Sequence, residues 1–335
     1  MKMTRIMAAA TAILVGSLAV AAAQEQVKVA TFVPEQSTGV AGVIKPWMDA
    51  VQADVGGAVK MQGFWGGTLG KSPVKQFELV QNGVADITWV LPSYTAGQFP
   101  EMSLFELPFL FRTADEASIV GWKLHEAGLL TGFDGVHVIG IFATEPNALF
   151  MEEPIAGLED LDGKKIRSAG AIQAKWLEAF GASPQALSSA EYNEALNRGT
   201  IDGVIQGWTG MNTFKSFPLV SQAVDVPAGT IPFLLLMNEA KWDSLPPEVQ
   251  ESMMTHGGLA MAESGAAAYT AAGEKVVEEQ KAEGRLEILI PDADKLAAHE
   301  ETTQAVHQWW IERTDNGQEI FDQTQAILAG LRGES

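Results

Sequence analysis

The sequence predicts an α/β fold with two lobes joined by several chain crossings, followed by a long helical C-terminal region. Short β-branched runs alternate with segments of helical periodicity through the first two thirds of the chain. From Glu239 onward the pattern is almost entirely helical. Because no internal repeat or low-complexity linker divides the chain, two interwoven lobes fit this pattern better than two separate domains.

In the first part of the chain, apolar residues three and four apart predict helices, and short β-branched runs predict strands. For example, Ile44, Trp47 and Val51 share one helix face, and Gly83 ends a later helix. We expect strands at 27–32, 59–64 and 87–91, a Gly-rich loop at 63–70, an apolar run at 104–111, and helices at about 42–55, 74–82 and 114–130.

The middle of the chain repeats this alternation, and the end does not. Strands are expected at 137–142, 148–151, 165–167, 204–205 and 234–237, with helices at 171–180 and 189–198. Beyond them lie a long Ala-rich helix at 250–281, a single strand at 287–290 and a helical segment at 299–331. We interpret the long helix as a strut packed across both lobes, since its small residues allow close packing, although a dimer contact is the alternative.

Composition excludes several classes of function. The chain has 335 residues with 22 Lys and Arg against 42 Asp and Glu, a formal charge of −20. Such an acidic surface argues against binding nucleic acid or anionic lipid, both of which need basic patches. The absence of Cys excludes disulfides, a thiolate nucleophile and Cys-ligated metals.

The N-terminus has the pattern of a secretory signal peptide. Lys2 and Arg5 give a positive start, and the uncharged segment 6–23 ends in small residues that suit cleavage near Ala23. The segment is at the short limit for a membrane anchor and is rich in Ala and Gly. We therefore expect export to the periplasm, with no direct membrane insertion after cleavage.

Searches for enzyme motifs fail. The run 66–72 resembles a phosphate-binding loop, but Trp65 stands where that motif needs Gly. The five His lack metal-ligand spacing, and no Gly-x-Ser-x-Gly elbow occurs. The acidic residues near 152–162 are more typical of a solvated loop than of paired catalytic carboxylates. We expect no enzymatic activity, no cofactor and no metal.

One basic residue, Arg167, is conspicuous in this acidic chain. It ends a short strand, beside Ser168. A guanidinium offers a rigid fork of donors that matches a carboxylate in bidentate fashion. From spacing alone, a ligand clamp and a structural ion pair with Asp160 or Asp162 are equally reasonable.

Several sequence blocks, in order, resemble the solute receptors of TRAP (tripartite ATP-independent periplasmic) transporters. No single block is specific, but together they cover nearly all of the chain that follows the signal peptide. The blocks are Phe64–Gly70, Leu79–Asp86, Leu107–Phe111, Leu158–Arg167, Phe180–Pro184, Glu191–Gly203 and Asn238–Gln250.

The resemblance implies a periplasmic-binding-protein fold with a ligand cleft between its lobes. It implies closure of the lobes about a hinge on a small-molecule carboxylate, and delivery to small and large permease subunits in the membrane. Arg167 would bind the carboxylate and Gln206 would add a polar contact. Sialic acid receptors of the family have a second Arg where this chain has Asn147. That departure favours a ligand with a single carboxylate, toward which Asn147 would add a hydrogen bond.

Aromatic residues at strand ends are expected to form the walls of the cleft, where ligands of open α/β sheets bind. Nine Trp against three Tyr suggest rings that face a ligand. We therefore favour an aromatic or apolar monocarboxylate, with sugar acids as the rival class. The expected wall residues are Trp208, Trp65, Trp89, Tyr94 and Phe150.

The resulting expectation is an extracytoplasmic solute receptor of a TRAP transporter. A receptor that signals to a histidine kinase, and an exported hydrolase, are the alternatives. We expect the signal peptide at 1–23, lobe I at 24–145 and 233–272, and lobe II with the C-terminal helices at 146–232 and 273–335.

Overall fold

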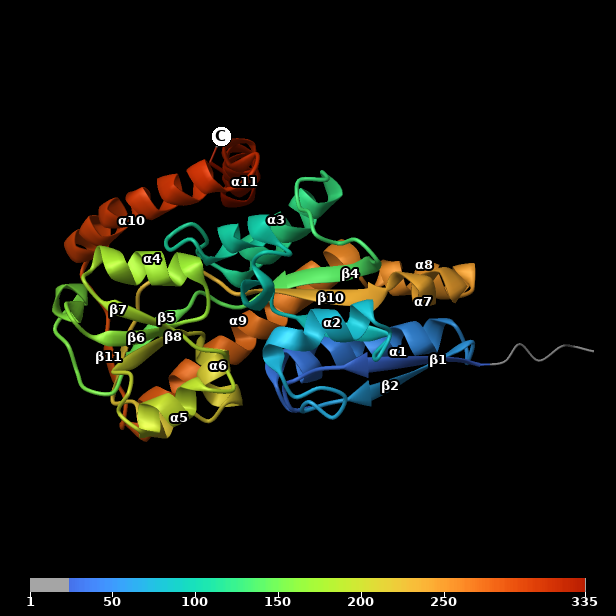
Figure 1. The fold of residues 1–335 in the computed structure, drawn as a ribbon, viewed down its shortest axis with the longest axis horizontal. Helices are drawn as coiled ribbons and strands as arrows, with labels where there is room; N and C mark the ends of the chain where they lie inside the picture. Colours follow the sequence, from blue (N-terminus) through green and yellow to red (C-terminus); the bar gives the residue numbers. More distant parts are fainter. Residues whose placement is uncertain (1–23, 335) are drawn as a thin grey trace, which may run out of the picture.

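A computed structural model describes residues 24–334, so the expected signal peptide lies outside the described residues. Two mixed β-sheets, each covered by helices, form two lobes (Figure 1). This arrangement confirms the predicted α/β class and two-lobed fold. Below, lobe I means the five-stranded sheet with its helices, and lobe II means the six-stranded sheet with its helices.

The sheet of lobe I has the strand order β2-β1-β3-β10-β4. Strand β1 is parallel to β2 and β3, whereas β10 arrives late in the chain and runs antiparallel to β3 and β4. The strands are β1 (Glu25–Ala30), β2 (Val59–Phe64), β3 (Ile87–Val90), β4 (Val136–Ala143) and β10 (Pro232–Asn238), and the helices are α1 (Lys45–Asp54), α2 (Gln76–Gln81), α3 (Ala114–Glu126), α7 (Glu239–Ser244) and α8 (Pro247–Thr255).

The sheet of lobe II has the order β11-β9-β5-β8-β6-β7. Two of its strands and one of its helices were not expected from the sequence, since β7 is short and polar and β9 and α6 have only three and six residues. The strands are β5 (Ala148–Met151), β6 (Lys165–Ser168), β7 (Ser183–Ala186), β8 (Gly203–Gln206), β9 (Gln222–Val224) and β11 (Glu287–Leu289), and the helices are α4 (Ala171–Ala179), α5 (Tyr192–Asn197) and α6 (Trp208–Thr213).

Three connections join the two sheets. The β4–β5 and β9–β10 segments pair where Asn147 N donates to Gly229 O at 2.7 Å and Ala228 N donates to Asn147 O at 3.0 Å. The third is α9 (Gly258–Glu283), which contacts α3 and β4 in lobe I and α6 in lobe II. The expected boundary at residue 272 therefore falls inside a continuous helix.

The long helical segments are interrupted where the sequence predicted continuity. The expected helix 250–281 is two helices, because Gly257 takes an extended conformation and Gly258 has a φ of 53°. The expected segment 299–331 is likewise divided into α10 (Ala293–Arg313) and α11 (Gly317–Arg332), with Asn316 in the left-handed region at φ 55°. Left-handed residues stop a helix because they cannot continue its hydrogen-bond ladder.

The C-terminal helices span both lobes. Helix α10 packs on α4 of lobe II, where Trp176 Nε1 donates to Thr303 Oγ1 at 3.1 Å. Helix α11 packs on α3 of lobe I through a mostly buried ion pair, with Arg332 Nε 2.7 Å from a carboxylate oxygen of Glu116. One cluster of buried apolar side chains continues from lobe I into lobe II.

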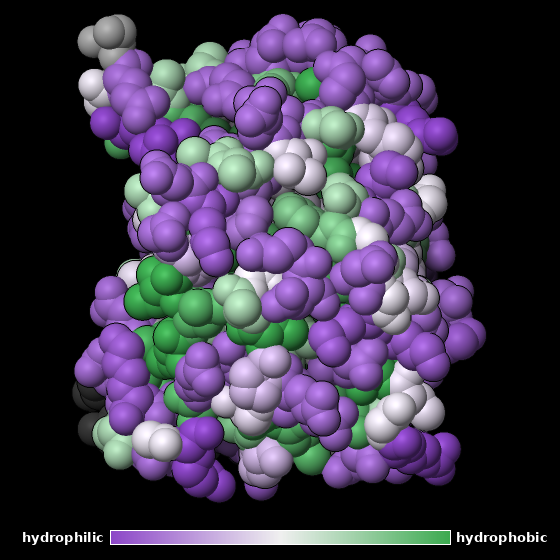
Figure 2. All heavy atoms as spheres, turned by 90° about the vertical axis from the view of Figure 1, so that its left-hand side faces the viewer, coloured by the Kyte–Doolittle hydropathy of each residue, from purple (hydrophilic) through white to green (hydrophobic). Residues whose placement is uncertain are grey.

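Polar side chains cover most of the outward face of lobe II, and apolar side chains gather there only in smaller areas (Figure 2). Within residues 24–334, no helix combines the length and apolar character needed to cross a membrane.

Candidate ligand-binding site

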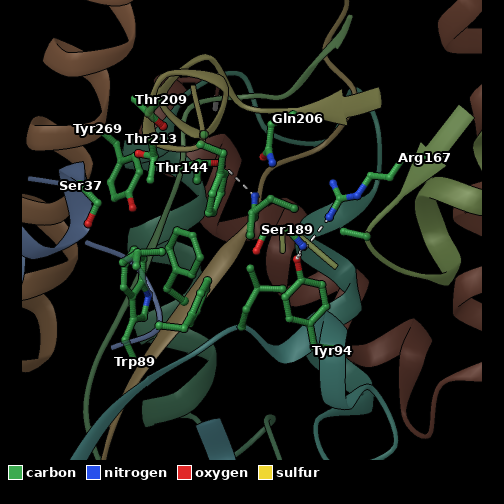
Figure 3. A pocket seen from close by; sticks show the side chains of 18 residues that line it. Ser37, Trp89, Tyr94, Thr144, Arg167, Ser189, Gln206, Thr209, Thr213 and Tyr269 are labelled. Atoms are coloured by element: carbon green, nitrogen blue, oxygen red, sulfur yellow. Dashed lines mark hydrogen bonds between the residues drawn. The ribbon is translucent and has the colours of Figure 1, made fainter. Parts of the chain in front are cut away.

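A cavity lies between the lobes, at the ends of strands from both sheets. It has about 570 Å³ of empty space, a volume that includes solvent at its mouth, and eighteen residues line it (Figure 3). We call it the cleft cavity. Its apolar lining is Phe32, Val33, Trp89, Leu91, Ala169, Phe214, Ile231 and Phe233, and its polar lining includes Ser37, Tyr94, Thr144, Arg167, Ser189, Gln206, Thr209, Thr213 and Tyr269.

Arg167 forms the polar end of this cavity. It lies on β6, which pairs in parallel with β7 and β8, and its side chain is only 2% exposed. Its Nε donates to Leu187 O and one terminal nitrogen to Ile205 O, both at 2.9 Å. Two carbonyls from separate strand ends thus fix the guanidinium plane, which also lies 5.3 Å from the centre of the Tyr192 ring.

The fixed guanidinium has no carboxylate partner within ion-pair distance among the described residues. Asp160 instead accepts a hydrogen bond from Ala156 N at 2.8 Å, and Asp162 packs beside Gly181. The ion pair with Asp160 or Asp162 that spacing allowed is therefore not formed. Of the five guanidinium N–H groups, three have protein partners, which leaves two for an anion.

Tyr94 joins the two lobes at this end of the cavity. It lies in a short 3-10 helix of lobe I, Pro92–Thr95, and its hydroxyl accepts from Arg167 Nη2 at 3.2 Å and from Ser189 N at 2.8 Å. Both donors belong to lobe II. Because the hydroxyl accepts two bonds, its own proton remains free to be donated toward the cavity.

Replacing Tyr94 with phenylalanine should weaken binding of a carboxylate ligand about 5- to 150-fold. The change leaves the buried N–H groups of Arg167 and Ser189 without a partner in the closed form, which costs about 1–3 kcal/mol. Calorimetric titration of wild type and Tyr94→Phe with benzoate would measure it. Equal affinities would mean that this contact between the lobes does not stabilise the bound state.

Gln206 also lines the cleft cavity, at the end of β8. Its Oε1 accepts from Gly207 N at 3.0 Å, and the side chain lies against Gly210, where an added Cβ would approach Oε1 to 2.6 Å. The amide nitrogen of Gln206 is therefore the group that can turn toward a ligand. Ser189 lies at the same end, and its buried hydroxyl has no partner among the described residues.

The structure brings together four of the eight side chains that the sequence suggested for the site, namely Arg167, Gln206, Trp89 and Tyr94. The other four are placed elsewhere. Trp208 and Asn147 line a separate cavity beside α9. Phe150 is buried in the core of lobe II against Trp208, with ring centres 5.0 Å apart. Trp65 folds back over Gly63 at the edge of the lobe I core.

Sequence reasoning missed several lining residues. Phe32 and Val33 lie two and three residues after the end of β1, so the strand-end rule could have found them. Ser37 and Tyr269 carry no such signal, because one lies in a loop and the other in the middle of α9.

Two buried acids flank the cleft cavity. Burial raises the pKa of Glu106 to about 7, although Ser93 and Arg167 act in the opposite direction. Burial also raises the pKa of Glu145 to about 7, while Thr209 at the start of α6 donates to its carboxyl through both N and Oγ1.

Glu106 should make the protein less stable as the pH rises from about 4.5 to about 7. The pKa of its carboxyl is higher in the folded protein than in the unfolded chain. Between the two pKa values the unfolded chain is ionised while the folded protein keeps the proton, so a rise in pH favours unfolding. The full loss is about 3 kcal/mol. The free energy of unfolding of Glu106→Gln, measured with urea, should therefore rise relative to that of wild type between pH 5 and 8. Glu248→Gln, which removes the same charge from an exposed site, should give no such trend.

A cavity between two lobes, with a fixed guanidinium at one end and apolar walls, is the arrangement expected of a solute-binding protein. The chain belongs to the family described as bacterial extracellular solute-binding protein, family 7 (DctP), whose model matches residues 29–313. The resemblance to TRAP solute receptors is thereby confirmed, and with it a family of receptors rather than enzymes. Such receptors bind small molecules and work with membrane permease subunits.

Solved structures of TRAP solute-binding proteins superpose on most of the chain. One from Rhodoferax ferrireducens T118, with copurified benzoate, has a TM-score of 0.85 at 27% identity, covering 91% of this chain and 98% of its own. A marine metagenome protein specific for aromatic acid ligands, solved with metahydroxyphenylacetate, has 0.85 at 27%, covering 92% and 99%. One from Bordetella bronchiseptica, with (R)- and (S)-mandelate, has 0.82 at 25%, covering 91% and 99%.

Proposed function

We propose that this protein captures an organic monocarboxylate with an aromatic or apolar body by closing its two lobes around it. The observation that carries the proposal is Arg167, a buried guanidinium with two N–H groups left for an anion. Gln206, Ser189 and the Tyr94 hydroxyl lie at the same end and would complete the hydrogen bonds to the carboxylate.

The lining of the cleft cavity supports a single carboxylate and an apolar body. Arg167 is the one Lys or Arg among the lining residues, so a second carboxylate would be buried without a counter-charge. Rings from both lobes, Phe32, Trp89, Phe214 and Phe233, provide flat apolar walls. The related structures that contain benzoate, metahydroxyphenylacetate and mandelate favour the same ligand class.

The chain would act outside the cytoplasm, after removal of a signal peptide near Ala23. From there it would deliver the closed, loaded form to the small and large subunits of a TRAP permease. Sugar acids are the alternative ligands, since they also stack on tryptophan. The mostly apolar walls favour an aromatic acid over a sugar acid, because a sugar needs a polar partner for each of several hydroxyls.

Thermal unfolding of the mature protein against a panel of organic acids would test the proposal. The panel needs benzoate, phenylacetate and mandelate, with succinate and glucuronate as competing classes. A ligand present at a hundred times its Kd stabilises the folded state by about 2.7 kcal/mol, which is readily detected. Stabilisation by the aromatic monocarboxylates alone is the expected outcome. Stabilisation by glucuronate or succinate alone would refute the ligand class.

A further inference from the structure

The end of the cleft cavity remote from Arg167 is also polar. Ser37 and Tyr269 lie at this far end in the close-up view, with Thr213 nearby, while Arg167 lies at the opposite end (Figure 3). Ser37 is 3% exposed, and its Oγ has no hydrogen-bond partner among the described residues. The indole N–H of Trp89, also 3% exposed, has none either.

Two side chains of the far end pack against the backbone near Ser37. An added Cβ at Gly39 would lie 2.5 Å from Cη2 of Trp89 and 2.9 Å from the hydroxyl oxygen of Tyr269. Both side chains therefore pack directly against Gly39, two residues from Ser37. Side chains from β3 and α9 thus meet at the segment that follows β1, and Trp89, Tyr269 and Ser37 each carry a group that can form a hydrogen bond.

The far end is suited to a neutral group rather than to an anion. No Lys or Arg lines it, and Glu145 lies near Tyr269, where its carboxyl acts with burial to raise the pKa of the Tyr269 hydroxyl. Glu145 itself is held by Thr209. A second ligand carboxylate would meet an acidic neighbour and no cation, whereas a hydroxyl or carbonyl could bond to Ser37 without adding charge.

From this geometry we propose that the ligand is an aromatic monocarboxylate that bears a neutral hydrogen-bonding group, a hydroxyl or carbonyl, on the part of its ring remote from the carboxylate. The inference rests on the proposed function, because Arg167 must orient the carboxylate toward its own end. The ring would then lie between the apolar walls, and its substituent would reach Ser37 and Trp89.

The unpartnered hydroxyl of Ser37 and N–H of Trp89 favour a ligand that bonds to them. A buried donor or acceptor that loses water without gaining a partner destabilises the closed complex, so an acid lacking the substituent binds with that penalty. A site that hydrogen-bonds a ligand hydroxyl therefore discriminates strongly against the analogue without it. We expect the hydroxylated acid to bind at least about tenfold more tightly than its parent.

Calorimetric titration with phenylacetate, 3-hydroxyphenylacetate and 4-hydroxyphenylacetate tests this inference in wild type, Ser37→Ala and Ser189→Ala. At least one hydroxylated acid should bind about tenfold or more tightly than phenylacetate, and Ser37→Ala should remove most of that preference. Ser189→Ala is the matched control. It removes another buried, unpartnered hydroxyl of the cavity, but at the Arg167 end, so it should weaken all three acids alike.

The outcomes separate this inference from the proposed function. If all three acids bind equally, or if Ser37→Ala keeps the preference, the inference is overturned. If Arg167→Ala then loses all binding, the proposal that the protein binds a monocarboxylate through Arg167 is still supported. If wild type binds none of the three acids, both the inference and the aromatic ligand class fall.

Discussion

Replacing Arg167 with alanine should raise the Kd for an aromatic monocarboxylate roughly 30-fold or more. Removing one partner of a buried, hydrogen-bonded charge pair costs about 2–5 kcal/mol, and each 1.4 kcal/mol is about a factor of ten in Kd. Here the other partner is the ligand carboxylate, which would be left in a cavity with no other Lys or Arg in its lining. Titration with benzoate, and with any acid found to stabilise the protein, gives the ratio.

The conservative change Arg167→Lys should recover only part of this affinity. A lysine keeps the charge, but it cannot reproduce the fork that reaches two carbonyls, Tyr94 and an anion together. Arg198→Ala is the matched control, because Arg198 lies in lobe II with its side chain 70% exposed in a surface ion pair. It should leave the Kd unchanged.

Folding has to be checked beside affinity, because Arg167 also holds Leu187 O and Ile205 O. Circular dichroism and urea unfolding of each variant measure that contribution separately. A folded Arg167→Ala protein that binds as tightly as wild type would show that this arginine is purely structural. The site assignment would then be wrong.

Substituting alanine for Gly229 should destabilise the protein by about 2–5 kcal/mol. Gly229 has a φ of 77°, which L side chains rarely adopt, and an added Cβ would lie 2.2 Å from the carbonyl oxygen of Glu106. The colliding atoms are backbone, so the clash can be relieved only by moving the hinge connection. The left-handed conformation adds about 1–2 kcal/mol.

Gly135→Ala separates these two causes. Gly135 has the same φ of 77°, but no atom lies within 4 Å of its added Cβ. The free energy of unfolding of Gly135→Ala should fall only by the cost of the left-handed conformation, about 1–2 kcal/mol. Urea unfolding of both variants measures the difference. Equal losses would mean that the hinge tolerates displacement from Glu106, contrary to the tight packing described here.

The sequence predicted the elements whose local signals agree with their surroundings. The strands of lobe I and the helix that ends before Gly83 were located within a few residues. Strand β7 was missed because its sequence, Ser-Pro-Gln-Ala, is polar and lies at a sheet edge. The break at Gly257 was missed because the sequence on both sides favours helix, whereas the close approach of the Ile139 and Met253 carbonyl oxygens to Gly257 is set by the tertiary fold.

The candidate site was partly predictable for a related reason. Arg167 stood out because a basic residue at a strand end is rare in this acidic chain. Phe150 could not be assigned to a face, since all four residues of β5 are buried and no alternation marks the cavity side. Tyr269 reaches the cavity only because α9 crosses both lobes, a placement that no local pattern in the sequence encodes.

The two ends of the cleft cavity draw most, but not all, of their polar groups from different lobes, since Tyr94 of lobe I reaches the Arg167 end and Thr213 of lobe II lies near the far end. Arg167, Gln206 and Ser189 come from lobe II, whereas Ser37 and Trp89 come from lobe I. Under the proposed function, recognition of the ligand's charge therefore rests mainly on lobe II residues, and recognition of its ring substituent rests mainly on lobe I residues. Substitutions at Ser37 and Trp89 would then change which acid is bound while Arg167, Gln206 and Ser189 keep the requirement for a carboxylate.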